Sequence, residues 1–267
     1  TIQHFYNSLS KKGLAPKTVK IIHGVLHEAL RQAVAVGYLR VNPSDSCTLP
    51  RIVKKQVKPL DDDAIREFLK EIHGHRFELL YLVTLFTGLR EGEVLGLAWD
   101  RVDFDKGTLL IDQQLQQAKD ESGKRQYGLV SLKNDRWRRI TPADFVMGLL
   151  RRQRSRQAEW RLRAGPAWED SGLVFTNELG KHLSPYTVYK NYKRLVASIG
   201  CPKARFHDLR HSYAVAAIKS GDDIKTVQGN LGHATAAFTL DVYGHVTDQM
   251  KRDSAERMQK FIESVSG

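Results

Sequence analysis

The sequence predicts an α+β fold that is mostly helical and contains a small antiparallel β-sheet. Apolar residues recur at helical spacing in most of the chain before residue 100 and again after Pro142, apart from a short LVF run at 173–175. Between residues 102 and 140 the pattern changes to short β-type runs separated by turn residues. A chain of 267 residues can bury the core of one large domain beside a smaller one.

The N-terminal region predicts a helix followed by a linker. Pro16 suits the first turn of a helix, and helical spacing continues up to Gly37. Residues 43–59 lack this spacing and contain three prolines and four basic side chains. We therefore expect three parts: residues 1–42, a basic linker at 43–59, and a main domain at 60–267.

The main domain is predicted to begin with two helices and to continue into hairpins. Asp61 to Asp63 place negative charge at the start of a helix that reads AIREFLKEI, and a second helix, FELLYLVTLFT, ends at Gly88. Turn residues at 105–107 and 121–123 then separate the runs VDFD, TLLIDQQL, YGLVSL and WRRI. The last segment, DQMKRDSAERMQKFIESV, predicts an amphipathic helix.

The charge balance predicts a polyanionic partner. The chain has 42 Lys and Arg against 30 Asp and Glu, a net charge of +12 and a pI of about 9.7. No apolar run reaches the roughly 20 residues of a membrane span, which favours nucleic acid over a membrane. The basic linker is either a solvated tether or a segment that contacts DNA phosphates. The two cysteines lack zinc-site spacing, so we expect a reducing cytoplasm.

One short segment, HDLRH, predicts an anion site. His207, Arg210 and His211 stand at positions i, i+3 and i+4, which share one face of a helix. His at i and i+4 is also the spacing of HExxH zinc sites, but here the Glu is absent and a permanent cation lies between the two histidines. A planar guanidinium beside a histidine suits a phosphate better than a divalent metal.

A second segment, TGLREGEVLGLAW, supplies another cation. Arg90 comes just after Gly88, at a turn into a short helix, and Glu93 lies three residues further on, where it can orient the arginine. Taken alone, this pattern is better explained as a helix end followed by an exposed arginine.

Together, TGLREGEVLGLAW, HDLRHSYA and NLGHATAAFTLDVYGHV resemble the tyrosine recombinase family over roughly residues 60–265. The order of these segments is most similar to integrases of conjugative transposons and temperate phages. Residues 1–42 resemble the C-terminal part of the family's helical core-binding domain, and we expect the chain to be a fragment. The family's two arginines, two histidines and tyrosine correspond here to Arg90, His207, Arg210, His233 and Tyr243.

The family's active-site lysine lies on a β-hairpin, before a run that contains arginine and a β-branched residue. In SLKNDRWRRI the matching residue is Lys133, and Lys124 is the alternative. Two further histidines have simpler interpretations. His211 can pack in the core and His245 can cap the preceding segment, so neither is placed among the catalytic residues.

The resemblance implies a clamp on the scissile phosphate. Negative charge accumulates on phosphate oxygens as the pentacoordinate state forms, so hydrogen-bond donors placed in advance stabilise it. Arg90, Arg210 and His233 would supply these donors. Two fixed guanidinium groups can do what other nucleases assign to metal ions, so no metal ion and no cofactor is expected.

The resemblance also implies covalent catalysis. Tyr243 would attack the phosphate and form a 3′-phosphotyrosyl intermediate. A tyrosine of pKa about 10 needs a base at neutral pH, and His207 is the candidate. Lys133 would protonate the leaving 5′-oxygen. Because the ester keeps the energy of the broken bond, another 5′-hydroxyl can reverse the reaction without ATP.

These features predict a site-specific DNA recombinase, or integrase, that integrates or excises a mobile element. A type IB topoisomerase-like enzyme and a catalytically inactive DNA-binding regulator remain alternatives. The expected partners are double-stranded DNA, further copies of the chain that form a dimer to tetramer on DNA, and an accessory directionality factor. The C-terminal helix would dock on a neighbouring copy or pack on its own chain.

Overall fold

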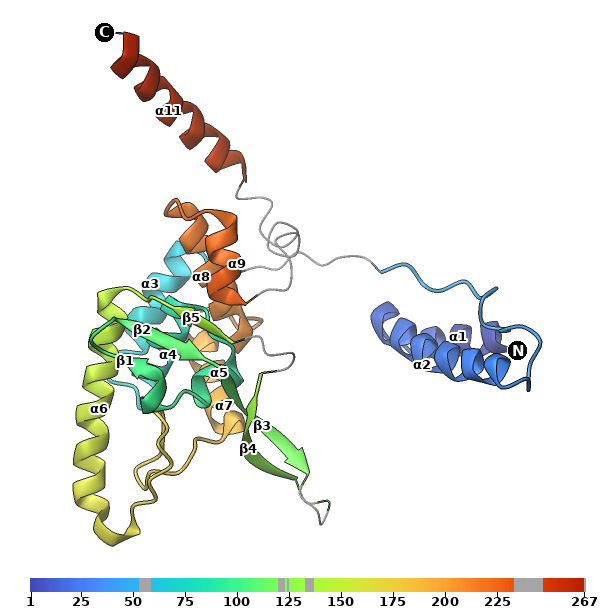
Figure 1. The fold of residues 1–267 in the computed structure, drawn as a ribbon, viewed down its shortest axis with the longest axis horizontal. Coiled ribbons are helices and arrows are strands. Elements are labelled where there is room, and N and C mark those ends of the chain that lie inside the picture. Colours follow the sequence, from blue (N-terminus) through green and yellow to red (C-terminus); the bar gives the residue numbers. More distant parts are fainter. Residues whose placement is uncertain (53–58, 120–122, 124, 133–136, 233–246, 267) are drawn as a thin grey trace. The chain divides into compact units, whose positions relative to one another are not determined.

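A computed structural model describes residues 1–52, 59–119, 123, 125–132, 137–232 and 247–266. The chain divides into two compact units, Thr1–Gln56 and Val57–Gly267. The described residues form helices and small antiparallel sheets, which confirms the predicted α+β fold class (Figure 1). Within this described part, no helix has the length and apolar character that a membrane span requires.

The first unit contains two helices that pack on each other, α1 (Ile2–Lys11) and α2 (Pro16–Ala35). Pro16 occupies the first turn of α2, as the sequence predicts. The contact is centred on Tyr6 and Val19, which are 1% and 0% exposed, and the Tyr6 hydroxyl bonds His23 Nδ1 at 3.0 Å. A helix of only 10 residues such as α1 is marginal alone, so it depends on this contact for its stability.

The second unit is built mainly of helices around a central one, α4. Its helical elements are α3 (Asp62–Glu71), α4 (Glu78–Thr87), α5 (Glu91–Leu95), η1 (Trp99–Arg101), α6 (Asp144–Ala164), η3 (Gly165–Ala167), α7 (Pro185–Ser198), α8 (Phe206–Lys219), α9 (Ile224–Leu231) and α11 (Thr247–Ser266). The predicted acidic start is confirmed, because Asp61 caps α3 by accepting a 2.8 Å hydrogen bond from the backbone of Ala64.

Among the described residues, the strands form two sheets, whereas one was predicted. They are β1 (Val102–Asp103), β2 (Thr108–Ile111), β3 (Gln113–Lys119), β4 (Arg125–Ser131) and β5 (Arg138–Ile140). One sheet has the order β1-β2-β5 and the other pairs β3 with β4, all antiparallel. The run TLLIDQQL divides at Asp112, whose carboxylate accepts a 3.0 Å hydrogen bond from Arg101. The LVF run contributes only an isolated bridge, between Leu173 and Ala98.

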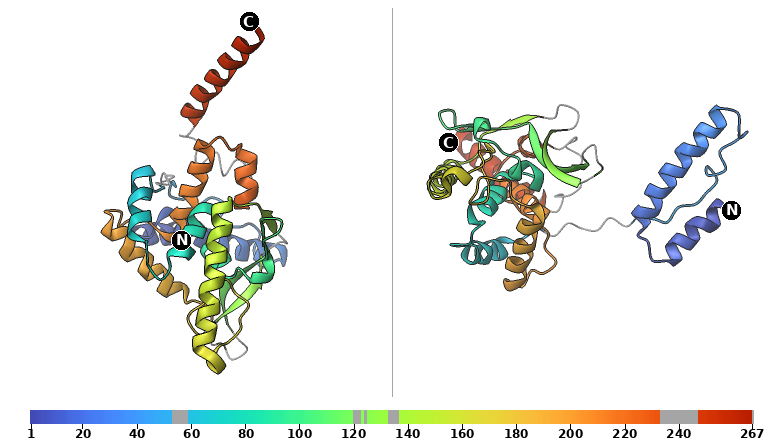
Figure 2. Two further views of the ribbon diagram at one scale, coloured as in Figure 1. Left: turned by 90° about the vertical axis from the view of Figure 1, so that its left-hand side faces the viewer. Right: turned by 90° about the horizontal axis from the view of Figure 1, so that it is seen from below.

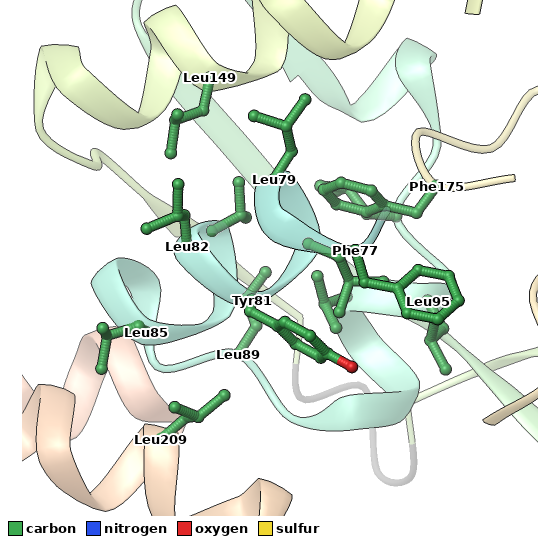
Figure 3. Close-up of a cluster of buried hydrophobic side chains, with 14 of the residues drawn as sticks. Phe77, Leu79, Tyr81, Leu82, Leu85, Leu89, Leu95, Leu149, Phe175 and Leu209 are labelled. Atoms are coloured by element: carbon green, nitrogen blue, oxygen red, sulfur yellow. The ribbon is translucent and has the colours of Figure 1, made fainter. Parts of the chain in front are cut away.

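The core of this unit surrounds α4. Almost every side of α4 is apolar and buried, as is typical of a helix in the centre of a domain. It packs against α6 and α8, and Figure 3 shows Leu149 of α6 and Leu209 of α8 on opposite sides of it. Each fully buried leucine contributes roughly 2 kcal/mol, so this packing holds the end of α4 in a fixed place.

The end of α4 is shaped by Gly88. Its φ of 66° is left-handed, and a Cβ at this position would lie 2.5 Å from Cδ1 of Tyr213 and 2.6 Å from Cδ2 of Leu231. Tyr213 belongs to α8 and Leu231 to α9, and these two helices lie side by side (Figure 1 and Figure 2). The absent side chain therefore lets the turn after α4 approach α8 and α9 closely.

Candidate active site

Arg90 lies directly after this turn and precedes the first residue of α5. Glu93, three residues on, accepts a 2.9 Å hydrogen bond from the Arg90 backbone N–H and a 2.7 Å hydrogen bond from Arg90 Nη1. The orienting role that the spacing predicts for Glu93 is thus confirmed. The Arg90 side chain is 39% exposed whereas that of Glu93 is fully buried. The guanidinium is therefore fixed from its inner side and open to solvent on the other.

Arg210 joins the ends of two helices. Its Nη1 donates to the carbonyl of Gly88 at 2.7 Å, and its Nη2 donates to the carbonyl of Leu231 at 2.5 Å. The residue is only 1% exposed. The C-terminal ends of α4 and α9 both carry partial negative charge, so their convergence on one guanidinium offsets the cost of burying it.

His207 and His211 lie one turn apart on α8, with ring centroids 4.8 Å apart and nearly perpendicular planes. The pKa of His207 is lowered, mainly because the surrounding protein desolvates the ring. The positive charges of Arg210, Arg205 and Arg90 lower it further. His211 is 5% exposed, in keeping with its interpretation as a core histidine, and burial lowers its pKa to about 4. His207 is thus mostly neutral at pH 7 and can accept a proton.

Arg138 of β5 is a participant that the sequence did not reveal. Its Nη1 and Nη2 form a fork on Glu93, with distances of 3.1 Å to Oε1 and 2.7 Å to Oε2. Burial opposes the charge of Glu93, but the hydrogen bonds and charge of Arg138 and the charge of Arg90 lower its pKa to about 2. The alternation of side chains along the strand in WRRI could have indicated that Arg138 faces inward with Ile140. In the structure Arg138 and Ile140 are buried and Arg139 is exposed.

The remaining predicted site residues lie outside the described residues. They are Lys133, its alternative Lys124, His233 and Tyr243. The structure therefore brings together Arg90, His207 and Arg210. Among the described residues, no group of three His, Cys, Asp or Glu side chains could hold a metal ion.

Glu91, next to Arg90, is a second carboxyl group of this region, and this residue is half-buried. Within the described part of the chain its Oε1 is buried and accepts no hydrogen bond. Burial raises its pKa to about 7, from an ordinary 4.5. The fold therefore favours the protonated form, and the stability contributed by Glu91 is complete below pH 4.5 and is lost as the pH rises through 7.

Glu91→Gln should consequently change the pH dependence of stability. The substituted side chain carries no charge at any pH. The free energy of unfolding of the variant should therefore rise relative to that of the wild type by about 1–2 kcal/mol between pH 5 and pH 8, after allowance for partial exposure. Urea unfolding at the two pH values measures this difference. Glu178→Gln, at an exposed position, is the control. A difference that is the same at both pH values would contradict the prediction.

The sequence of this chain is similar to those of known recombinases and integrases. The model of the phage integrase family matches residues 51–250. A tyrosine recombinase XerC-like protein of Caldanaerobacter subterraneus subsp. tengcongensis is 33% identical, over 98% of this chain and 70% of that protein. The ICEBs1 integrase of Bacillus subtilis is 27% identical over the same shares of the two chains.

The fold is also that of a solved integrase structure. The Tn1549 transposon integrase, in complex with transposon right end DNA, aligns with a TM-score of 0.78 and 22% identity, covering 96% of this chain and 84% of that one. The chain belongs to the phage integrase family, the tyrosine site-specific recombinases. The resemblance to integrases of conjugative transposons is confirmed.

Proposed function

We propose that the chain cleaves and rejoins DNA strands through a 3′-phosphotyrosyl intermediate and thereby integrates or excises a mobile element. The observation that carries this proposal is the convergence of Arg90, Arg210 and His207 around the ends of α4 and α9. Two guanidinium groups and a neutral imidazole are the chemistry that a scissile phosphate requires.

In this mechanism the two arginines act as the phosphate clamp. Arg90 is the more accessible, and its Nη2 makes only a long hydrogen bond, 3.4 Å, to the carbonyl of Gly232. A phosphate oxygen is a stronger acceptor and would replace that bond at small cost. His233, the next residue along the chain, would donate a further hydrogen bond to the phosphate.

Proton transfers fall to residues that can change their protonation state. His207 would accept the proton of the Tyr243 hydroxyl as it attacks, because its lowered pKa keeps it neutral at pH 7. Lys133 would protonate the leaving 5′-oxygen. None of these steps calls on a metal ion or a cofactor.

The parts of the chain would divide the work on DNA. Residues 1–42 would belong to a core-binding domain, 43–59 to a basic linker along the phosphates, and 60–267 to the catalytic domain. By analogy with the DNA-bound transposon integrase, the partner is double-stranded DNA, on which several copies would assemble with an accessory directionality factor. Such an enzyme would act where the DNA is, in the cytoplasm.

One plasmid experiment tests this function against its two alternatives. Core sites are first selected from a random duplex pool by binding to the chain, and two copies are placed as direct repeats in a supercoiled plasmid. In EDTA and without ATP, a recombinase should release two smaller circles. Relaxed plasmid of unchanged size would indicate a topoisomerase-like enzyme, and bound but unaltered plasmid would indicate a regulator. A plasmid with one site is the control.

A further inference from the structure

Arg138 is buried and all its described contacts lie inside the protein. Its side chain is 9% exposed, and its fork holds both carboxylate oxygens of Glu93, whose side chain is fully buried. A fork fixes the orientation of a carboxylate as well as its position. Since the same carboxylate accepts the 2.7 Å hydrogen bond from Arg90 Nη1, the orientation of Arg90 depends on Arg138.

Arg138 also holds the end of α9. Its Nε donates to the carbonyl of Asn230 at 2.7 Å. The next two carbonyls accept from the other arginines, that of Leu231 from Arg210 and that of Gly232 from Arg90. Three successive carbonyls at the end of one helix are thus bonded by three different guanidinium groups.

Gly232 allows this close approach. Its φ is 64°, and a Cβ there would lie 2.9 Å from Arg138 Nη1. The Arg138 guanidinium therefore packs directly on the backbone that leads into His233. Arg139, its neighbour on β5, is exposed and donates to Thr108 Oγ1 at 3.3 Å, away from these contacts. The alternation of the strand thus separates an inward arginine from an outward one.

We propose that Arg138 is a positioning residue for DNA cleavage, which aligns the Arg90 guanidinium through Glu93 and fixes the end of α9 through Asn230. The inference rests on the proposed function. Arg138 does not touch the phosphate itself. Its loss would leave Glu93 with Arg90 as its partner, and the Arg90 guanidinium would turn inward, away from the phosphate.

The test compares two scissile groups in single-turnover cleavage. A phosphodiester is an anion whose two non-bridging oxygens both need hydrogen-bond donors. A methylphosphonate at the same position has a methyl group in place of one of these oxygens, is uncharged, and needs Arg90 less. Arg138→Met and the milder Arg138→Lys are measured beside Arg90→Ala, the reference for loss of Arg90, and Arg139→Met, the matched control. Circular dichroism and DNA binding verify that each variant is folded.

Arg138→Met should cleave the phosphodiester about 10²-fold more slowly than the wild type, the loss expected when a reacting group is misplaced by about 1 Å. On the methylphosphonate the loss should be much smaller, as for Arg90→Ala, and Arg138→Lys should show the same pattern at reduced size. Equal slowing on both substrates, or wild-type rates in both Arg138 variants, would overturn the positioning role alone. If the wild type cleaves neither substrate, the proposed function itself is overturned.

Discussion

Tyr243→Phe should abolish the covalent link between protein and DNA and leave DNA binding intact. Phenylalanine keeps the shape of the ring but lacks the oxygen that becomes bonded to phosphorus. No other oxygen nucleophile is expected to replace it, because attack requires both a nearby base and an aligned phosphate. We therefore expect complete loss of the adduct instead of a partial effect.

A nicked suicide duplex measures this result. The selected core site carries a nick close to the scissile phosphate, so that the short leaving strand diffuses away and the covalent intermediate accumulates. The reaction is run in EDTA and separated on a denaturing gel. Tyr186→Phe, at a tyrosine that is 67% exposed, is the control and should form the adduct like the wild type. An adduct in Tyr243→Phe would assign the nucleophile to another residue.

Arg210→Lys should lower both the cleavage rate and the stability. One ammonium group cannot reach the carbonyls of Gly88 and Leu231, which lie on two elements, and at the same time face a phosphate. We expect cleavage to slow by about 10²- to 10³-fold, the loss typical of removing one transition-state donor. A buried carbonyl left without its donor should lower the free energy of unfolding by about 2 kcal/mol.

These two effects are measured separately. Single-turnover cleavage with saturating protein gives the rate, and urea unfolding gives the stability. Arg101→Lys is the control, because Arg101 also bonds two partners, Asp100 and Asp112, but lies outside the site. It should cleave at the wild-type rate. If the rate loss in Arg210→Lys disappears after correction for the unfolded fraction, Arg210 does not act as a phosphate donor.

Much of the fold follows from local patterns. Pro16 at the start of α2, Asp61 before α3 and Gly88 after α4 mark element ends by their own backbone chemistry. The division of the strands into two sheets could not be predicted in this way. It depends on which strand pairs with β2, and the register of β2 with β5 joins residues about thirty positions apart.

The site divides in a similar way. Arg90 with Glu93, and His207 with Arg210, are separated by three residues, so one helical turn predicts their relation. Arg138 has no such local partner, because it contacts Glu93 and Asn230, which are 45 and 92 positions away in sequence. Only the folded chain brings these residues together. The choice between Lys133 and Lys124 is likewise not decided by spacing.

The salt bridges of Glu93 have a consequence for how cleavage responds to acidity. With a pKa of about 2, Glu93 stays ionised at any pH a cell experiences, and arginine side chains do not lose their protons there. The charges of the Arg90–Glu93–Arg138 network are therefore constant across that range. A bend in the pH–rate profile would then report on groups outside this network, His207 and Glu91 among them. In the proposed mechanism, the two arginines hold the substrate, and a different set of side chains, His207 and Lys133, transfers the protons.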